Sequence, residues 1–534
     1  MKIRKLPLCI LLALSCAAML FAGGSQESTA ATVTDNLNAE GLPILKEKET
    51  FTIAVQQTSA LKTPEERLCV QIAEEETNIH IEWMEIPASA WEEKINIMAS
   101  TGTLPDAIIG EAYLDRNYEL FAPLDELIDQ YAPHVKARLE AREDYQRALK
   151  MPDGKIHALP NGDESTQIRI PTHTWINKAW LDKLGLDMPT NTDELREVLM
   201  AFKTQDPNGN GIADEIPFAF ETGWNWATSI KNFIGAFGVV ENSEHVFMDG
   251  NTVVMSALQP EYYEMLKYMH GLYEDGLIND DCFTVSSDQF SALSGGKNIV
   301  GMFVGYRNTN CLGQSNPDDF VALPVISSPV SEGVVGAVMP TRVGGFAISA
   351  DCKNPAALVR WYDYLNSTLE NALLWGRGER GFVWEIQEDE NGKHPVFIYR
   401  TEEEYKEKGG YLSNAEYRAA ESFAGNTPAV WWGDYDVDII YEGDWPADSK
   451  LAAVIRDLPY AVYGLPVGTA TEENSNRRAI LLVDIENYLT KFMADSIING
   501  IDDAKWQAHL ETMKDLKADE YVQLCQEFVN SLDS

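Results

Sequence analysis

Residues 206–217, DPNGNGIADEIP, space their oxygen-bearing groups as a calcium-binding loop would. Calcium takes about 6 to 8 oxygen ligands from carboxylates, amides and main-chain carbonyls around a tight turn. The groups available here are the side chains of Asp206, Asn208, Asn210, Asp214 and Glu215 and the main-chain carbonyl of Ile212. An EF-hand loop would carry its closing glutamate at the twelfth position, which is Pro217 here, so this loop is only related to that motif. Asp, Asn, Gly and Pro also form ordinary turns, so both a bound ion and a plain turn fit the residues.

Motifs of common enzymes are missing from the sequence. There is no G-x-S-x-G elbow, no H-E-x-x-H zinc motif and no phosphate-binding loop, and the 8 histidines are scattered. Asp434 and Asp436 beside Trp432 could serve a glycosidase as acid and base. The chain holds 83 Asp and Glu residues, however, so some carboxylates must lie near tryptophans by chance. The residues therefore favour a protein that binds without catalysis, and a secreted glycosidase is the alternative.

The overall composition is that of a folded, strongly acidic protein. At 534 residues the chain can form several domain-sized units, and 45% hydrophobic residues argue against disorder. The net charge of −41 excludes the basic surface that nucleic acids or anionic membranes would require. The charge supports solubility more than it identifies a ligand.

The N-terminus has the features of an export signal. MKIRK is basic, residues 6–21 are apolar, and LFAGG offers small residues for cleavage, which we expect after Ala22. A competing interpretation makes Cys16 the lipid-modified first residue of a lipoprotein. Residues 1–22 are thus predicted to be a signal peptide, and residues 23–47, rich in Ser, Thr, Ala and Asn, a flexible leader.

Strand and helix patterns then alternate along the chain. Residues 51–55, 79–86 and 106–110 have strand patterns, and residues 63–77 and 89–100 have helical ones. This alternation predicts an α/β fold with a mostly parallel sheet, in which loops at the carboxyl ends of strands bind ligands. Tyr113 lies in such a loop. A helix is predicted over residues 192–204, with Asn191 and Glu194 resembling a capping box.

Several segments together resemble a known family. TGTLPDAI, DGKIHALP, WINKAWLDKLGLDMPTNTDELREVLMAF, DPNGNGIADEIP, GGKNIVGMF and GGFAISADCKNPAALVRWYDYLNS are similar to segments of the extracellular solute-binding proteins of bacterial ABC importers. The resemblance is closest to the large carbohydrate-binding branch that includes alginate- and glycosaminoglycan-oligosaccharide-binding proteins. It covers about residues 50–530 in the same order.

The resemblance implies a two-lobed Venus-flytrap fold of type II, with a multi-strand hinge that closes on a ligand and a membrane permease that receives it. On this basis, lobe 1 comprises residues 48–170 and 341–385, and lobe 2 comprises residues 171–340 and 386–534. The chain is expected to cross between lobes near residues 165–172, 330–342 and 380–390. The resemblance also implies a structural calcium, held by the six ligands of residues 206–215 already named.

An oligosaccharide ligand would require flat aromatic rings to stack on sugar faces and planar polar groups to bind hydroxyls. Candidates lie mainly in segments without regular periodicity. The predicted ligand-binding residues are Trp224, Trp226, Trp431, Trp432, Asp434, Tyr435, Arg377, Trp384, His173, Trp175, Tyr113 and Tyr306. Arg377 could bind a uronate carboxylate, or it could pair with Glu379 or Glu385 as a structural ion pair.

The expected protein is therefore an exported, monomeric, non-catalytic oligosaccharide-binding protein that delivers its ligand to an ABC permease. It would be periplasmic or attached to the cell surface, with calcium as its structural ion. A peptide- or lipid-binding protein of the same fold is a further alternative, because a fold does not fix the ligand.

Overall fold

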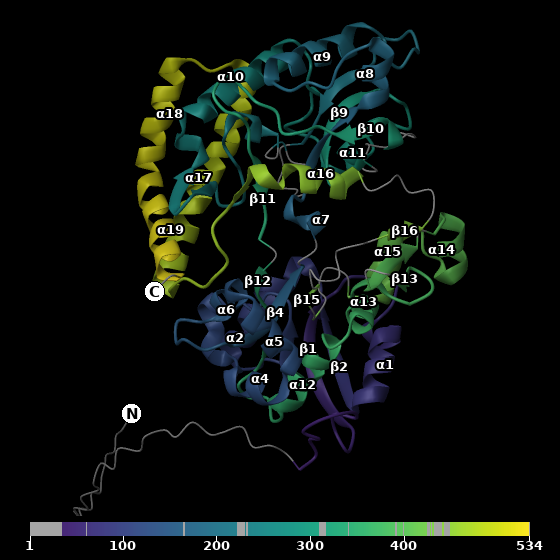
Figure 1. Ribbon diagram of the computed structural model, residues 1–534. Coiled ribbons are helices and arrows are strands. Elements are labelled where there is room, and N and C mark those ends of the chain that lie inside the picture. The colour runs from purple at the N-terminus through teal and green to yellow at the C-terminus, as the bar shows by residue number, and fades with distance from the viewer. Residues whose placement is uncertain are drawn as a thin grey trace, which may run out of the picture.

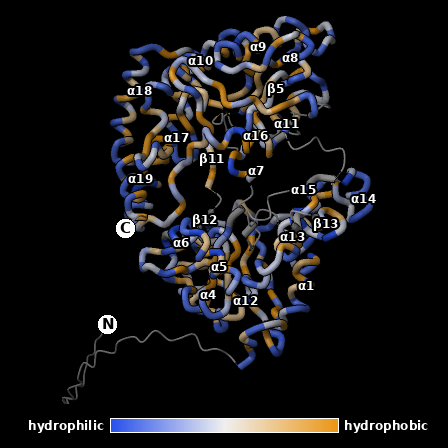
Figure 2. Tube along the Cα trace, in the orientation of Figure 1, coloured by the Kyte–Doolittle hydropathy of each residue, from blue (hydrophilic) through white to orange (hydrophobic). Residues whose placement is uncertain are grey.

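Two separate sheets, each covered by helices, form two lobes that lie one above the other in Figure 1. The structure is a computed structural model that describes residues 35–532, apart from residues 60, 164–165, 222–229, 231–232, 309–316, 340, 390–391, 399, 424–427, 429, 432–439 and 443–448. Hydrophobic segments run through both lobes, and hydrophilic segments are common on the outer helices (Figure 2). In the part of the chain that the structure describes, no helix is both long enough and apolar enough to cross a membrane.

The first lobe is built on a six-stranded mixed sheet. Its strands, in spatial order, are β15 (Val430–Trp431), β4 (Ala158–Asp163), β12 (Thr341–Ile348), β3 (Ala107–Ile109), β1 (Glu49–Gln56) and β2 (Ile79–Ile86). β1 runs parallel to β2 and β3, and β12 runs antiparallel to β3 and β4. The helices of this lobe are α1 (Leu68–Thr77), α2 (Trp91–Thr101), α3 (Leu114–Asn117), α4 (Asp125–Tyr131), α5 (Pro133–Ala141), α6 (Glu143–Leu149), α12 (Pro355–Leu365) and α13 (Leu369–Arg377).

The second lobe is built on a four-stranded sheet in the order β10 (Phe320–Ala322), β5 (His173–Asn177), β9 (Val300–Gly305) and β6 (Ile216–Ala219). Every residue of β5 and β9 is buried, as expected for strands covered on both faces. Smaller pairs are β7 (Val246–Asp249) with β8 (Thr252–Met255), and β11 (Val335–Ala337) with β17 (Ala461–Tyr463). The helices are α8 (Lys178–Leu184), α9 (Thr192–Thr204), α10 (Pro260–Glu274), α11 (Ser287–Ser291), α16 (Ser449–Asp457), α17 (Glu472–Asn499), α18 (Asp503–Asp515) and α19 (Ala518–Leu532).

A small three-stranded sheet lies beside the first lobe (Figure 1). It contains β13 (Trp384–Asp389), β14 (Gly392–Ile398) and β16 (Ile440–Glu442), and α14 (Glu402–Gly409) and α15 (Asn414–Glu421) pack with it. Its core is shared with α13, and Phe423 enters the core of the first lobe. The described residues of 386–423 therefore pack with lobe 1, and not with lobe 2 as the resemblance implied. Sequence periodicity identifies elements but does not show which lobe they contact.

Three connections join the lobes. The first runs from β4 to β5 through α7 (Thr166–Arg169), the second from β11 to β12, and the third from β16 to α16. The first two fall within the ranges expected from the sequence. The third differs from the expected range of residues 380–390, because those residues form the start of the small sheet instead.

The N-terminal segment from Asp35 is folded, although residues 23–47 were expected to be a flexible leader. Leu37, Ile44 and Leu45 are buried in the core of the first lobe. The guanidinium of Arg360 on α12 also donates a hydrogen bond of 2.8 Å to the carbonyl of Gly41. Three apolar side chains in the segment ending GLPIL thus attach it to the lobe.

Candidate functional site

Many of the residues predicted to bind ligand lie at or next to strand ends of the two large sheets. These strand ends lie at the edge of each sheet that is directed toward the other lobe. In lobe 1, β15 runs parallel to β4, and both strands lead to the region of the connections (Figure 1). In lobe 2, β6 runs parallel to β9, so their carboxyl ends share one edge. β5 is antiparallel to β9 and pairs His173 with Gly305, which brings the start of β5 to the same edge.

His173, Trp175 and Tyr306 come together at this edge of the second lobe. The rings of His173 and Trp175 are 5.9 Å apart, and Tyr306 follows Gly305 at the end of β9. Trp175 has no exposed surface, and its indole N–H donates 2.9 Å to the carbonyl of Gly305. This indole therefore packs in the core and has no surface to offer a ligand in this conformation.

Charged groups of α16 lie beside Tyr306 and His173. The ammonium of Lys450 lies 3.0 Å from the centre of the Tyr306 ring and also donates 2.9 Å to the carbonyl of Pro171. His173 is 4% exposed, and burial, together with the nearby charges of Lys450 and Arg456, lowers its pKa to about 3. His173 is thus a neutral imidazole at the end of the first connection.

Tyr113 occupies the loop after β3 in the first lobe. It is half-buried, and its backbone is left-handed with φ 52°, which is costly for a residue other than glycine. The guanidinium of Arg116 lies 4.7 Å from the centre of its ring. β3 pairs with β12, whose first residues belong to the second connection, so the loop lies at the edge nearest the other lobe.

Arg377 and Trp384 lie with the small sheet. Trp384 is 1% exposed, and its indole N–H donates 2.7 Å to the carbonyl of Gly378, so it is a core side chain. Arg377 lies 4.6 Å from the ring centre of Phe397. The carboxylates that were candidate partners of Arg377 are engaged by other cations, Glu385 by Arg380 and Glu379 by Lys408.

The tryptophan-rich loops fall largely outside the described residues. This applies to Trp224, Trp226, Trp432, Asp434 and Tyr435 and to the side chain of Trp431. The ends of both loops are described. Residues 222–229 follow Glu221. Glu221 comes just after β6, at the same edge of the lobe 2 sheet as Tyr306. Residues 432–439 join β15 of the large sheet of lobe 1 to β16 of the small sheet.

Sequence reasoning did not identify α16 as part of this region. Lys450 and Asp457 at its two ends are 1% and 3% exposed. Arg456 binds Asp457 with N···O distances of 2.7 and 2.8 Å and donates to the carbonyls of Ala322 and Leu323. The alternation of charged and apolar residues in SKLAAVIRD is typical of a surface helix, so the sequence contained no signal for these buried charges.

The oxygen-rich loop lies between α9 and β6, at the outer end of the second lobe. The carboxylate of Asp206 accepts hydrogen bonds from the amides of Gly209, Asn210 and Gly211 at 2.9, 3.1 and 3.1 Å. The side-chain amide of Asn210 donates 2.9 Å to Asp214. Asp206 adopts φ 47°, and Gly209 and Gly211 adopt φ 75° and 73°, so the backbone coils tightly around these oxygens.

The donor set of this loop fits a hard cation. One carboxylate oxygen of Glu215 is buried and has no hydrogen-bond partner among the described residues. Burial and the nearby carboxylates of Asp206 and Asp214 raise the pKa of Glu215. Three carboxylates, two amides and a carbonyl within ten residues match calcium in type. Within the described ranges, however, no group of three or more Asp, Glu, His or Cys side chains is close enough together to hold a metal ion.

The sequence profile of the family described as "Bacterial extracellular solute-binding protein" matches residues 58–372, more than half of the chain. The protein belongs to this family. The predicted fold class, a two-lobed α/β fold of the periplasmic-binding-protein type with a multi-strand hinge, is thereby confirmed, as is the recognition of the family from sequence segments.

Individual members are similar over nearly the whole chain. The fructooligosaccharide ABC transporter substrate-binding protein FusA of Streptococcus pneumoniae serotype 4 is 29% identical, with 96% of this chain and 95% of that protein covered. Its structure in complex with kestose has a TM-score of 0.73 at 26% identity and covers 91% of this chain and 99% of that one. A structure of a FusA "EF-hand mutant" in complex with fructo-nystose gives the same values.

A more distant structure has the same fold. An HMO-binding, ABC-transporter-associated solute-binding protein from Bifidobacterium longum infantis has a TM-score of 0.77 at 24% identity, with 90% of this chain and 99% of that chain covered.

Proposed function

We propose that this protein captures an oligosaccharide between its two lobes and delivers it to the permease of an ABC importer. The observation that carries the proposal is the end-to-end similarity to a fructooligosaccharide-binding component of such an importer, 96% of one chain against 95% of the other. We propose a neutral oligosaccharide as the ligand, because fructooligosaccharides carry no charge. Comparing the binding of neutral and acidic oligosaccharides tests this choice.

The arrangement of the lobes supports capture by closure. Three connections join them, and such hinges allow two rigid bodies to close about a few residues. The candidate loops with Trp224, Trp226, Trp431, Trp432, Asp434 and Tyr435 begin at sheet edges directed toward the opposite lobe. Tyr113 and Tyr306 lie at the same edges. Aromatic rings there would stack on the apolar faces of sugar rings.

Calcium is proposed to stabilise lobe 2 and to take no part in ligand capture. The ligands would be Asp206, Asn208, Asn210, Asp214, Glu215 and the carbonyl of Ile212. The orphaned, buried carboxylate oxygen of Glu215 supports this proposal, because a cation would satisfy it. The existence of a FusA structure described as an EF-hand mutant is consistent with a site of this kind in a relative.

The protein is proposed to bind its ligand without converting it and to act outside the cytoplasm. Proteins of this family are extracellular solute-binding proteins. Export would use residues 1–22, with cleavage after Ala22, and lipid attachment through Cys16 is the alternative. The mass of the mature protein distinguishes these two outcomes. The working form is proposed to be a monomer.

The proposed function is tested by thermal unfolding with a panel of neutral and acidic oligosaccharides. A ligand that binds only the folded state raises the melting temperature, by an amount that grows with concentration. We expect a neutral oligosaccharide to stabilise the protein and to be recovered intact. Release of reducing sugar, or no stabilisation by any member of the panel, would contradict the proposal.

A further inference from the structure

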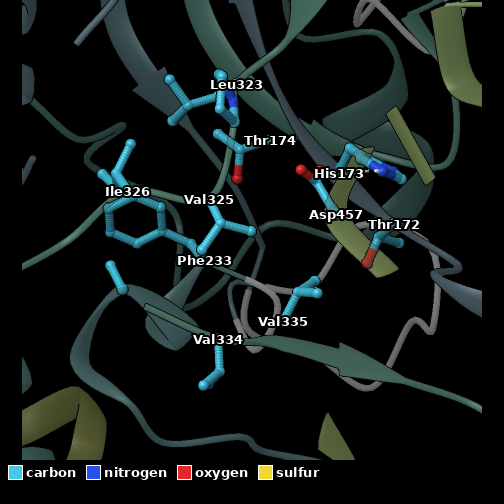
Figure 3. A pocket seen from close by; sticks show the side chains of 12 residues that line it. Thr172, His173, Thr174, Phe233, Leu323, Val325, Ile326, Val334, Val335 and Asp457 are labelled. Atoms are coloured by element: carbon cyan, nitrogen blue, oxygen red, sulfur yellow. Dashed lines mark ion pairs between the residues drawn. The ribbon is translucent and has the colours of Figure 1, made fainter. Parts of the chain in front are cut away.

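One small cavity in lobe 2 is lined by residues of the first connection and of two elements that the other connections join, β11 and α16 (Figure 3). Thr172 and His173 end the first connection, Val334 and Val335 lead into the second, and Asp457 ends α16, the helix that the third connection enters. The remaining wall is mostly apolar and is formed by Thr174, Phe233, Ala236, Leu323, Pro324, Val325 and Ile326. A group bound in this cavity would touch the first connection, the start of β11 and the end of α16 at once.

Two polar side chains in the cavity wall, Thr172 and His173, have no hydrogen-bond partner in the part of the chain that the structure describes. The hydroxyl of Thr172 and both ring nitrogens of His173 are buried without a hydrogen-bond partner among the described residues. His173 Nε2 lies 3.8 Å from a carboxylate oxygen of Asp457, which is too far for a hydrogen bond. Buried polar groups without partners are costly, so an occupant that bonds to them would stabilise the fold.

The size and charge of the cavity identify water as that occupant. Its volume is about 40 Å³, and a water molecule needs about 10–15 Å³ on this measure and two to four polar partners. An anion would meet the carboxylate of Asp457, and a cation would lie near Lys450 and Arg456, both of which lower the pKa of His173. An apolar occupant would leave the hydroxyl and the imidazole unpaired.

The helix that carries Asp457 is fixed at both ends. At its start, the ammonium of Lys450 donates 2.9 Å to the carbonyl of Pro171 in the first connection. At its end, Arg456 binds the carbonyls of Ala322 and Leu323 at 3.1 and 3.2 Å and holds Asp457. A water link from Asp457 to Thr172 would therefore add a further tie between the first connection and α16, which the hydrogen bond of Lys450 to Pro171 already joins.

We propose that this cavity binds ordered water that links Thr172 and His173 to Asp457, and that this link makes the first connection and α16 move together when the lobes open and close. The water site depends only on the cavity. The coupled movement rests on the proposed function, because it assumes that the lobes change their separation.

The variants Thr172→Val, Thr172→Ser and Thr192→Val test the proposal. Thr172→Val keeps the shape and removes the hydroxyl, and Thr172→Ser restores it. Thr192→Val is the matched control, because Thr192 is also 1% exposed and its buried hydroxyl has no partner in the described part of the chain, but it begins α9, outside the cavity. Spin labels attached at Lys94 and Gln507 report the separation of the lobes. Both residues are exposed, on α2 and α18 respectively, and the labelled protein carries Cys311→Ser.

We expect a high-resolution crystal structure to show water between Thr172, His173 and Asp457. Without ligand, Thr172→Val should broaden the distribution of label distances, whereas Thr172→Ser and Thr192→Val should match the parent.

An empty cavity in that crystal structure would overturn the water site. A Thr172→Val distance distribution identical to that of Thr192→Val would overturn the coupling. If Thr172→Val broadens the label distances but no oligosaccharide binds to the parent or to any variant, the link from Thr172 and His173 to Asp457 is supported. Only the proposed ligand is then contradicted.

Discussion

The guanidinium of Arg67 donates a hydrogen bond of 2.8 Å to the main-chain carbonyl of Ser422, 355 positions further along the chain. Arg67 is 1% exposed, donates 3.1 Å to the hydroxyl of Thr58 and lies 4.5 Å from the ring centre of Phe423. Thr58 also donates to the carbonyl of Ala419. One buried cation thus fastens the end of α15 to the loop that follows β1.

Replacement of Arg67 by Met should destabilise the protein and loosen α15. Removing hydrogen bonds from a buried charged group costs about 2 kcal/mol or more, and we expect that loss in the free energy of unfolding measured in urea. Hydrogen exchange should also accelerate at the amides of residues 419–423. Arg196→Met, which removes an exposed ion pair with Asp275, is the control and should change stability by about 0.5 kcal/mol or less. Equal losses for the two variants would refute the anchoring role.

Stability should fall as the pH drops below about 6.5, the pKa of an ordinary histidine. Burial lowers the pKa of His173 to about 3 and also lowers that of His509. The unfolded chain therefore binds protons that the folded protein excludes, and each histidine contributes a slope of at most about 1.4 kcal/mol per pH unit. Urea unfolding between about pH 7.5 and pH 5 measures this slope.

The variant His509→Phe isolates one of these contributions. His509 stacks 4.0 Å from Phe492, so a phenyl ring suits the site, although it cannot reproduce the hydrogen bond to the carbonyl of Ala257. The variant is expected to lose some stability at pH 7.5 and to show a smaller slope than the parent. An unchanged slope would mean that folding does not alter the pKa of His509.

Removal of calcium should lower the melting temperature, and re-addition should restore it. An ion present at about 100 times its dissociation constant contributes about 2.7 kcal/mol. Asp214→Ala should abolish the response to chelator, whereas Asp187→Ala, which removes an exposed carboxylate outside the loop, should retain it. A chelator response that persists in Asp214→Ala would place the ion elsewhere.

Tryptophans of the candidate loops should affect binding, and tryptophans of the core should affect folding. Trp432→Ala is expected to weaken oligosaccharide binding about tenfold or more, as for aromatic residues at the centre of interfaces. Trp384→Phe should lower the melting temperature and leave the affinity unchanged, because its indole is buried and bonded to Gly378. Calorimetric titration and thermal unfolding of both variants separate the two effects. A large loss of affinity in Trp384→Phe alone would reverse these assignments.

Local patterns made much of the fold predictable. The helix expected over residues 192–204 is observed as Thr192–Thr204. Its buried residues Leu195, Val198, Leu199 and Phe202 recur at helical spacing. The side chain of Asn191 caps it by accepting 2.9 Å from the amide of Glu194. These interactions lie within a few positions of one another, so the sequence contains them directly.

Interactions between distant segments were not predictable in the same way. The attachment of α15 to lobe 1 depends on Arg67 and Ser422, and no short pattern records that pair. Trp175 was a candidate for ligand contact but packs in the core, because exposure depends on what covers a strand. Lys450 can be buried because its ammonium donates a hydrogen bond to a carbonyl of another segment and an aromatic ring faces it.

The central claim is that the protein binds an oligosaccharide and leaves it intact. Calorimetric titration with the neutral oligosaccharide that stabilises the protein most, followed by mass spectrometry of the recovered sugar, tests that claim most directly. We predict saturable binding at one site per chain and a recovered sugar of unchanged mass. Shortened products, or no heat of binding with any oligosaccharide, would contradict it.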